Sequence, residues 1–156
     1  MGIAITLKDY MSKMGSEYEV VSHPRAMTAL EIAQAAHVSG DCLAKAVILE
    51  DDQGYVMAVV PSTHQVRLNE LRQQLHRELH LASEYELSGL FKDCDLGALP
   101  PVGQAYGIET IVAEDLAQQP EVYFEAGDHE ELIRMSGNEF RALMSGAEAM
   151  ACSRHI

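Results

Sequence analysis

The sequence predicts an α+β fold in which a mixed, largely antiparallel and curved sheet is surrounded by helices. Three observations lead to this prediction. Segments with helical spacing of apolar residues are intermixed along the chain with β-type segments. Two β-type runs flank a short glycine-containing turn, which is typical of an antiparallel hairpin. Finally, 156 residues, 47% of them hydrophobic and without an internal repeat, suffice for a single domain over residues 1–156 that buries about two-thirds of its unfolded surface.

The N-terminal part of the chain predicts a helix, a strand and a second helix. Residues 6–15, TLKDYMSKMG, place apolar side chains at helical spacing and end in a glycine, which commonly terminates helices. Residues 18–23, YEVVSH, form a β-type run that ends before a proline. The second helix, TALEIAQAAHV at residues 28–38, opens with Thr28 and Glu31 in capping-box spacing.

A hairpin is predicted in the middle of the chain, and it contains one unexpected lysine. LAKAVILE (43–50) and YVMAVVP (55–61) flank the turn sequence DDQG. Side-chain alternation puts Lys45 on the same face as Leu43 and Leu49, within an otherwise apolar run. A buried ammonium without a partner costs several kcal/mol. Either the long stem of Lys45 reaches the sheet edge, or Lys45 projects into a pocket and meets an anion there, and the run alone leaves both open.

The C-terminal half continues the mixture of helices and strands. Ser83 and Glu86 have the capping-box spacing of a short helix, and Ser136 and Glu139 open a terminal helix in the same way. The predicted helices are 68–79, 83–91 and 136–146, and the predicted strands are 109–113 and 121–127.

Composition excludes several classes of partner. Eleven basic and 24 acidic residues give a net charge of -13, which disfavours the many phosphate contacts of non-specific nucleic-acid binding. Any nucleic-acid partner therefore has to be held over a small local footprint. The apolar runs are shorter than the ~20 residues of a membrane helix, and the N-terminus has no secretory signal pattern. Three widely spaced cysteines without a C-x-x-C pair suit a reducing cytosol. We therefore expect a cytoplasmic protein that binds neither DNA nor a membrane.

The segment HRELH, residues 76–80, has two histidines at the i, i+4 spacing of zinc-binding helices. In the H-E-x-x-H motif the glutamate directly follows the first histidine, whereas Glu78 lies about 200° around the helix and projects away from both histidines. The capping Ser83 also indicates that the helix ends before His80. The sequence contains no P-loop, nucleophile elbow or dinucleotide fingerprint. We therefore expect neither a metal nor a cofactor.

Two loops combine stiffness with polar groups. GALPPVG, residues 97–103, has two prolines between glycines, so its backbone cannot join a central strand. This loop is either a rigid connector or a preorganised wall that presents backbone groups to a ligand. In FEAGDHEEL, residues 124–132, Asp128 and His129 follow a β-type segment. They either face a cleft or form a turn in which Asp128 caps a following helix.

Five segments, taken in order, carry a resemblance to a known family. They are HP at 23–24, TALEIA at 28–33, LAKAVIL at 43–49, GALPPVG at 97–103 and YFEAGDHEELIRMSGNEF at 123–140. In this order and spacing, over roughly residues 5–146, they resemble the YbaK/prolyl-tRNA synthetase editing-domain family. The resemblance implies that family's α+β fold and its activity, hydrolysis of the ester that links a wrong amino acid to tRNA. A chain without a synthetase core resembles the free-standing, trans-acting members.

The resemblance also implies roles for individual residues. Lys45 matches the family's strand lysine, which deacylation requires and which is thought to engage the tRNA end. Gly97 and Pro101 match its G-x-x-x-P loop, whose backbone helps to hold the substrate, and His129 lies where several members have a histidine near the active pocket. The predicted catalytic residues are therefore Lys45 and His129, and the predicted substrate-binding residues are His23, Thr28, Gly97, Ala98, Leu99, Pro100, Pro101 and Asp128.

Two departures from the family leave the amino-acid specificity open. His23 stands in the amino-acid pocket where the synthetase insertion domain has threonine, and Ala46 occupies a position where relatives often carry polar residues. Three arginines at and just before the predicted helix at residues 68–79, Arg67, Arg72 and Arg77, either help to hold the tRNA or form a solvated helix face.

The predicted activity is trans-editing hydrolysis of mischarged aminoacyl-tRNA, for example alanine on proline tRNA. An aminoacyl ester is already activated, so a positioned water and a stabilised oxyanion suffice without a metal or a covalent intermediate. The expected partner is the tRNA acceptor end, and an aminoacyl-tRNA synthetase is a further candidate partner. Two alternatives stay open: a non-catalytic module that binds the tRNA end or a synthetase, and an unrelated small-ester hydrolase.

Overall fold

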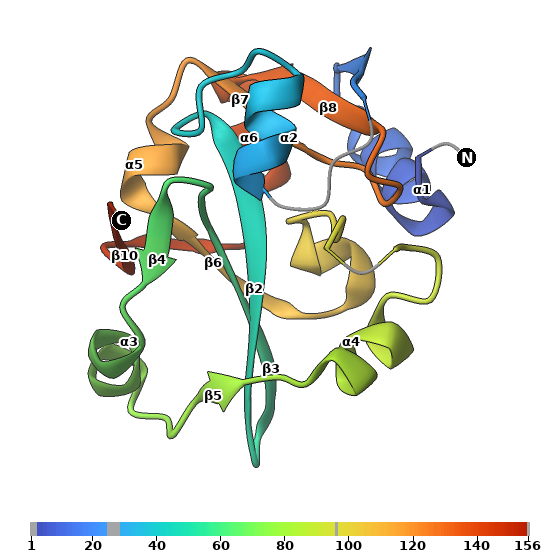
Figure 1. Ribbon diagram of the computed structural model, residues 1–156. Helices are drawn as coiled ribbons and strands as arrows, with labels where there is room; N and C mark the ends of the chain where they lie inside the picture. Colours follow the sequence, from blue (N-terminus) through green and yellow to red (C-terminus); the bar gives the residue numbers. More distant parts are fainter. Residues whose placement is uncertain (1–2, 25–28, 96, 156) are drawn as a thin grey trace.

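The computed structural model describes residues 3–24, 29–95 and 97–155, and these form one large sheet, a separate two-stranded sheet and the helices around them (Figure 1). The strands are β1 (Glu19–Ser22), β2 (Leu43–Asp51), β3 (Gly54–Pro61), β4 (His64–Val66), β5 (His80–Leu81), β6 (Glu109–Ala113), β7 (Glu121–Glu125), β8 (Glu131–Ser136), β9 (Glu148–Met150) and β10 (Ser153–His155). The helices are α1 (Ile5–Met14), α2 (Ala29–Ala35), α3 (Leu68–Leu75), α4 (Glu84–Leu90), the short 3₁₀ helix η1 (Gly103–Tyr106), α5 (Glu114–Ala117) and α6 (Gly137–Leu143).

The large sheet has the strand order β1-β8-β7-β2-β3-β6-β9, and β5 pairs with β2 at the side of this path. Within the described residues its antiparallel pairs are β1/β8, β8/β7, β2/β3 and β2/β5, and its parallel pairs are β7/β2, β3/β6 and β6/β9. The longest pairing is the β2/β3 hairpin, which runs from Ala44 opposite Pro61 to Asp51 opposite Gly54. The predicted mixed, largely antiparallel sheet is therefore confirmed.

Local signals in the sequence account for several element ends. Helix α1 ends at Gly15, whose φ of 66° is the left-handed conformation that glycine tolerates. Helix α4 begins with the full capping box of Ser83 and Glu86. The β2/β3 turn closes because the carboxylate of Asp51 accepts hydrogen bonds from the backbone N–H groups of Gln53 and Gly54, at 2.9 and 3.2 Å.

Other element boundaries differ from the prediction. Helix α3 ends at Leu75, so the helix predicted to reach residue 79 is shorter, and Leu79 packs into the core from outside it. The segment after Asp128 forms β8 rather than a helix. Helix α6 is not the terminal element, because β9 and β10 follow it. The predicted capping by Thr28 lies outside the described residues.

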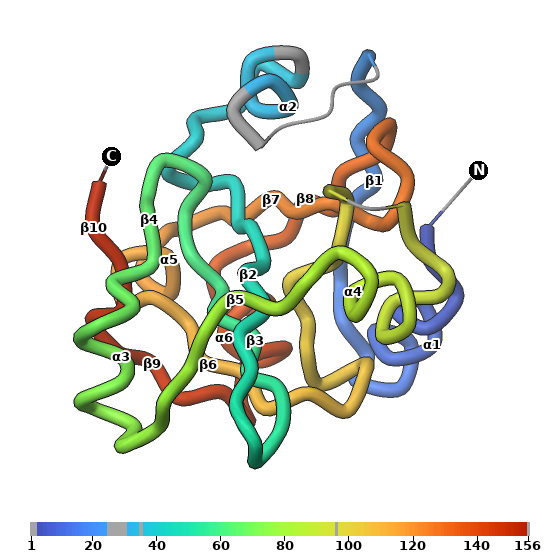
Figure 2. Tube along the Cα trace, turned by 60° about the horizontal axis from the view of Figure 1, so that its bottom comes forward, coloured from blue at the N-terminus to red at the C-terminus, as the bar shows by residue number. Residues whose placement is uncertain are grey.

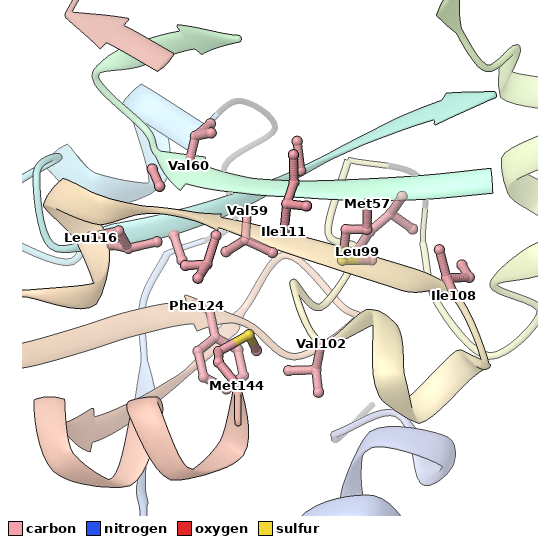
Figure 3. Packing of buried hydrophobic residues seen from close by; sticks show 14 of the residues in the cluster. Met57, Val59, Val60, Leu99, Val102, Ile108, Ile111, Leu116, Phe124 and Met144 are labelled. Atoms are coloured by element: carbon pink, nitrogen blue, oxygen red, sulfur yellow. The ribbon is translucent and has the colours of Figure 1, made fainter. Parts of the chain in front are cut away.

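The core lies between the sheet and the helices, and it fixes the loop at residues 97–103. Figure 3 shows Val59 of β3 and Ile111 of β6 within the same cluster as Leu99 and Val102 of this loop. Pro100 and Pro101 are also buried, whereas Gly97 is exposed. The loop is thus anchored in the core at one end and open to solvent at the other. None of the helices in the described part of the chain has the length and apolar character needed to cross a membrane.

Candidate active site

A cavity of about 280 Å³ opens where β2, β7, α2, α4 and the loop at residues 97–103 meet. In Figure 1, β2 begins beside α2 at the top of the molecule, and Figure 2 shows α2 standing above the sheet. The residues that line the cavity are Ile32, Leu43, Ala44, Lys45, Ala46, Glu84, Leu87, Gly97, Leu99 and Glu125. Among these described residues most are apolar, and the charged groups are the ammonium of Lys45 and the carboxylates of Glu84 and Glu125. Such a cavity suits a small ligand with a few polar groups.

Lys45 lines the cavity from a strand in the middle of the sheet. It is half-buried, and its Nζ donates to the backbone carbonyl of Ser62 at 3.4 Å. Among the described residues no carboxylate forms an ion pair with it. Burial lowers the pKa of Lys45, because desolvation disfavours the ammonium. Of the two interpretations of this lysine, the structure supports the one in which it faces a pocket.

Glu125 stands beside Lys45 on the same wall. Strands β2 and β7 are parallel, with Ala44 opposite Phe124 as their last registered pair, so Lys45 and Glu125 are the next residues on the two strands. Adjacent strands lie about 4.8 Å apart, and both side chains line the cavity. Opposite charges therefore occupy neighbouring positions without bonding to each other, since Lys45 turns to Ser62 and Glu125 turns to His23.

The carboxyl group of Glu125 is buried in this wall, and its pKa is raised. It is 6% exposed, and its Oε1 lies 3.3 Å from Nε2 of His23, which is 7% exposed. Burial, together with the nearby carboxylate of Asp128, raises the pKa of Glu125 to about 7, against the opposing effect of the neighbouring His129 and its backbone N–H. Oε2 of Glu125 is buried and has no hydrogen-bond partner within the described part of the chain. A buried carboxylate oxygen without a donor is rare in folded proteins and needs an explanation.

The loop at residues 97–103 forms part of the cavity wall, as its functional interpretation requires. Gly97 and Leu99 line the cavity, whereas the predicted binding residues Ala98, Pro100 and Pro101 are buried behind it. Gly97 has a φ of 85°, a left-handed conformation that a residue with a side chain adopts only with strain.

The predicted residues Asp128 and His129 lie in the turn between β7 and β8, behind Glu125. Oδ1 of Asp128 accepts the backbone N–H groups of Glu130 and Glu131, each at 3.0 Å, so this side chain holds the turn. His129 is buried with a φ of 62°. Neither residue is among the described residues that line the cavity, and His129 reaches it through its effect on Glu125.

His23 also lies behind the wall rather than on it. Its ring is held from both sides, with Nδ1 at 2.7 Å from the carbonyl oxygen of Pro24 and Nε2 on Glu125. The backbone N–H of His23 donates to the backbone carbonyl of Glu130 at 2.8 Å. The predicted site residue Thr28 lies outside the described residues. The structure thus brings Lys45, Gly97 and Leu99 together at the cavity and places His23 and His129 around Glu125.

The arginines near α3 are engaged by carboxylates and carbonyls. Arg67 pairs with Glu70, and Arg72 donates to the backbone carbonyl of Leu79 at 2.8 Å. Arg77 binds Asp51 with two guanidinium nitrogens and also pairs with Glu109. None of these arginines is among the residues that line the cavity. Their interpretation as a solvated, internally paired face is the one that the structure supports.

The histidines of HRELH do not share a helix face. His76 ends α3 with a φ of 54°, and His80 lies in β5, where its Nε2 is 3.2 Å from Glu50. In the part of the chain that the structure describes, no group of three or more His, Cys, Asp or Glu side chains is arranged to hold a metal ion.

Glu125 is the site residue that the sequence interpretation missed. It lies inside the segment FEAGDHEEL, from which only Asp128 and His129 were singled out. The available signal was a charged residue at the end of the apolar run VYF. Like Lys45 in β2, Glu125 is a charged side chain in a strand that is otherwise apolar, and such a side chain needs a partner or a pocket. Its position next to Lys45 depends on the parallel pairing of two strands that are distant in sequence, which no local pattern encodes.

Fold and cavity together define a small α+β domain with a charged, ligand-sized pocket at the ends of two parallel strands. Residues 23–143 match the family model described as the aminoacyl-tRNA editing domain, so the chain belongs to the aminoacyl-tRNA editing domain family. This confirms the resemblance predicted from the sequence. No curated protein matches the sequence.

Solved structures share the fold. A proposed trans-editing enzyme for prolyl-tRNA synthetase is 25% identical, with a TM-score of 0.84 over 97% of this chain and 96% of that one. A scaffold protein from computational epitope grafting is 24% identical, with a TM-score of 0.83 over 98% and 97%. A proposed signal transduction protein from Marinobacter aquaeolei VT8 is 18% identical, with a TM-score of 0.79, and this chain spans 31% of its length.

Proposed function

We propose that this protein is a trans-editing deacylase that hydrolyses the ester bond of mischarged aminoacyl-tRNA, with alanine on proline tRNA as the first candidate substrate. The observation that carries the proposal is Lys45, a half-buried cation on the wall of a cavity without an ion-pair partner among the described residues. Membership of the editing family supports the reaction class, and the similarity to a proposed trans-editing enzyme for prolyl-tRNA synthetase supports the candidate tRNA.

The size of the cavity fits a small aminoacyl group. About 280 Å³ lies at the lower end of the ~300–1,000 Å³ typical of small-molecule sites. Such a space accepts an aminoacyl group with part of the terminal ribose. It is too small for an aminoacyl group together with a whole nucleotide. Leu43, Ala46 and Leu99 supply apolar contacts for a short side chain.

Hydrolysis of an aminoacyl ester requires positioning and charge stabilisation more than chemical activation. In the proposed mechanism Lys45 supplies positive potential to the terminal phosphate or ribose and to the oxyanion that develops on the ester carbonyl. Its effect is strengthened because the cavity wall is partly desolvated. The loop beginning at Gly97 holds the aminoacyl group and a water molecule, and the ribose hydroxyl of the substrate assists. His129 acts from behind the wall by orienting Glu125.

The charge of the chain limits how tRNA is held. With a net charge of -13 and the arginines near α3 already paired, a broad grip on the tRNA body is unfavourable. Recognition is therefore confined to the single-stranded acceptor end, and a synthetase that holds the same tRNA supplies additional affinity. This proposal places the protein in the cytoplasm with its substrate.

A panel of mischarged tRNAs tests the proposal. The purified protein is expected to release amino acid from at least one of them, and Lys45→Ala is expected to lower kcat/KM at least 100-fold, because an oxyanion donor is worth about 10²–10³ in rate. Lys92→Ala, at an exposed lysine away from the cavity, is the matched control and is expected to keep full activity.

Three results would contradict the proposal. Binding of tRNA without turnover on any member of the panel would indicate the non-catalytic module. Faster hydrolysis of simple esters than of aminoacyl-tRNA would indicate a small-ester hydrolase. Equal turnover by wild-type protein and Lys45→Ala would remove the role assigned to Lys45.

A further inference from the structure

We propose that Glu125 is the binding partner of the substrate's α-ammonium group, so that the cavity selects esters of free amino acids over other acyl esters. This inference rests on the proposed function, because it names the part of the aminoacyl-tRNA that this side chain recognises. It assigns a substrate-binding role to a residue that lies outside the Lys45 and Gly/Pro-loop set.

The first step is the unsatisfied oxygen. Glu125 is 6% exposed, its Oε1 is occupied by His23, and its buried Oε2 has no hydrogen-bond partner among the residues that the structure describes. Leaving such an acceptor unpaired costs its desolvation penalty in the free protein. Because Glu125 lines the cavity, a ligand in that cavity can supply the missing donor.

The second step is that the neighbouring cation on the wall does not fill this role. Lys45 lies next to Glu125 on the adjacent parallel strand, yet its Nζ donates to the carbonyl of Ser62. No arginine is found among the described residues that line the cavity. The wall therefore presents a separated cation and anion to whatever enters between β2 and β7.

The third step is the chemistry of the ligand. An aminoacyl ester carries a positive ammonium on the carbon next to an ester carbonyl, whose oxygen becomes negative during hydrolysis. Lys45 and Glu125 have the complementary charges at neighbouring positions about one strand spacing apart. An ammonium beside Glu125 also favours its ionised form, which burial alone disfavours. Ligand and wall thus stabilise each other's charged states.

The test compares alanyl-tRNA with lactyl-tRNA, in which a hydroxyl replaces the ammonium at nearly the same size. Each enzymatic rate is divided by the spontaneous hydrolysis rate of the same ester, because the ammonium itself activates the ester. Wild-type protein is expected to prefer alanyl-tRNA at least 10-fold on this corrected scale. Glu125→Gln is expected to reduce the preference to less than 3-fold, and Glu130→Gln, in the exposed position of the following turn, is expected to retain it.

The outcomes separate this inference from the proposed function. If wild-type protein hydrolyses both esters with equal corrected rates, or if folded Glu125→Gln keeps the full preference, the inference is wrong while the deacylase activity stands. If wild-type protein hydrolyses no aminoacyl-tRNA at all, the proposed function itself is wrong and the inference falls with it. The wild-type comparison needs no variant, so equal corrected rates overturn the inference even if Glu125→Gln fails to fold.

Discussion

Replacing Glu125 by glutamine should change how the stability of the protein depends on pH. Burial raises the pKa of this carboxyl from an ordinary value of 4.5 to about 7. The folded state therefore binds more protons than the unfolded state between these values, and stability is lost as pH rises through this window. Glutamine does not titrate, so the Glu125→Gln protein lacks this loss.

The size of the effect follows from the shift. One pKa unit corresponds to 1.36 kcal/mol, so the buried carboxylate costs about 3 kcal/mol once it is fully ionised. The free energy of unfolding of Glu125→Gln, measured relative to wild-type protein, should therefore rise by about 3 kcal/mol between pH 4 and pH 8. A carboxamide does not titrate, so the cost of burying the carboxamide itself shifts both ends of the comparison equally.

Urea unfolding at intervals between pH 4 and pH 8 measures this difference. Glu130→Gln is the matched control, because this glutamate is exposed in the adjacent turn, and its difference from wild-type protein should stay nearly constant. A constant difference for Glu125→Gln as well, within about 0.5 kcal/mol, would refute the reasoning. It would mean that burial does not raise the pKa of Glu125 in the folded protein.

Two further predictions concern the elements that frame the cavity. Ser83→Ala removes the hydroxyl that accepts the backbone N–H of Glu86 in the capping box of α4, so it should lower the free energy of unfolding by about 1 kcal/mol. Ser88→Ala, later in the same helix, is the control and should lower this free energy by less. Urea unfolding of both variants measures the difference. Gly97→Ala places a side chain at a φ of 85°, so it should lower the free energy of unfolding by about 1 kcal/mol and reduce the rate of deacylation. Gly89→Ala is the control, because this residue lies in helix α4 with open space around it. It should leave the free energy of unfolding unchanged or raise it, and it should leave the rate of deacylation unchanged.

The elements that the sequence predicted correctly are those with local signals. The end of α1 at Gly15 and the capping box of Ser83 and Glu86 require only neighbouring residues, and the same holds for the β2/β3 turn closed by Asp51. These interactions form wherever the segment is placed, so a pattern of a few residues is enough to predict them.

The elements that the sequence did not predict depend on distant partners. Strands β4 and β10 are three residues each and exist because His64 and Val66 pair with residues at the end of the chain. Strand β8 was not predicted, because the two interpretations of Asp128 were a residue facing a cleft and a helix cap, whereas its carboxylate closes a turn between two strands. The cavity was predicted only in part for the same reason. Lys45 was predicted from the pattern of its own strand, whereas Glu125 becomes its neighbour only through the pairing of β2 with β7.

The parallel pairing of β2 with β7 has a consequence for how the protein reaches its active form. The hairpin that carries Lys45 has short-range contacts and can form early, whereas the strand that carries Glu125 is separated from it by seven described elements, from β4 to α5. Contacts between segments so distant in sequence form slowly, since the intervening chain loses entropy before the contact is gained. We therefore expect the pocket to be completed after the hairpin, so that a partly folded chain that already has its hairpin still lacks the site.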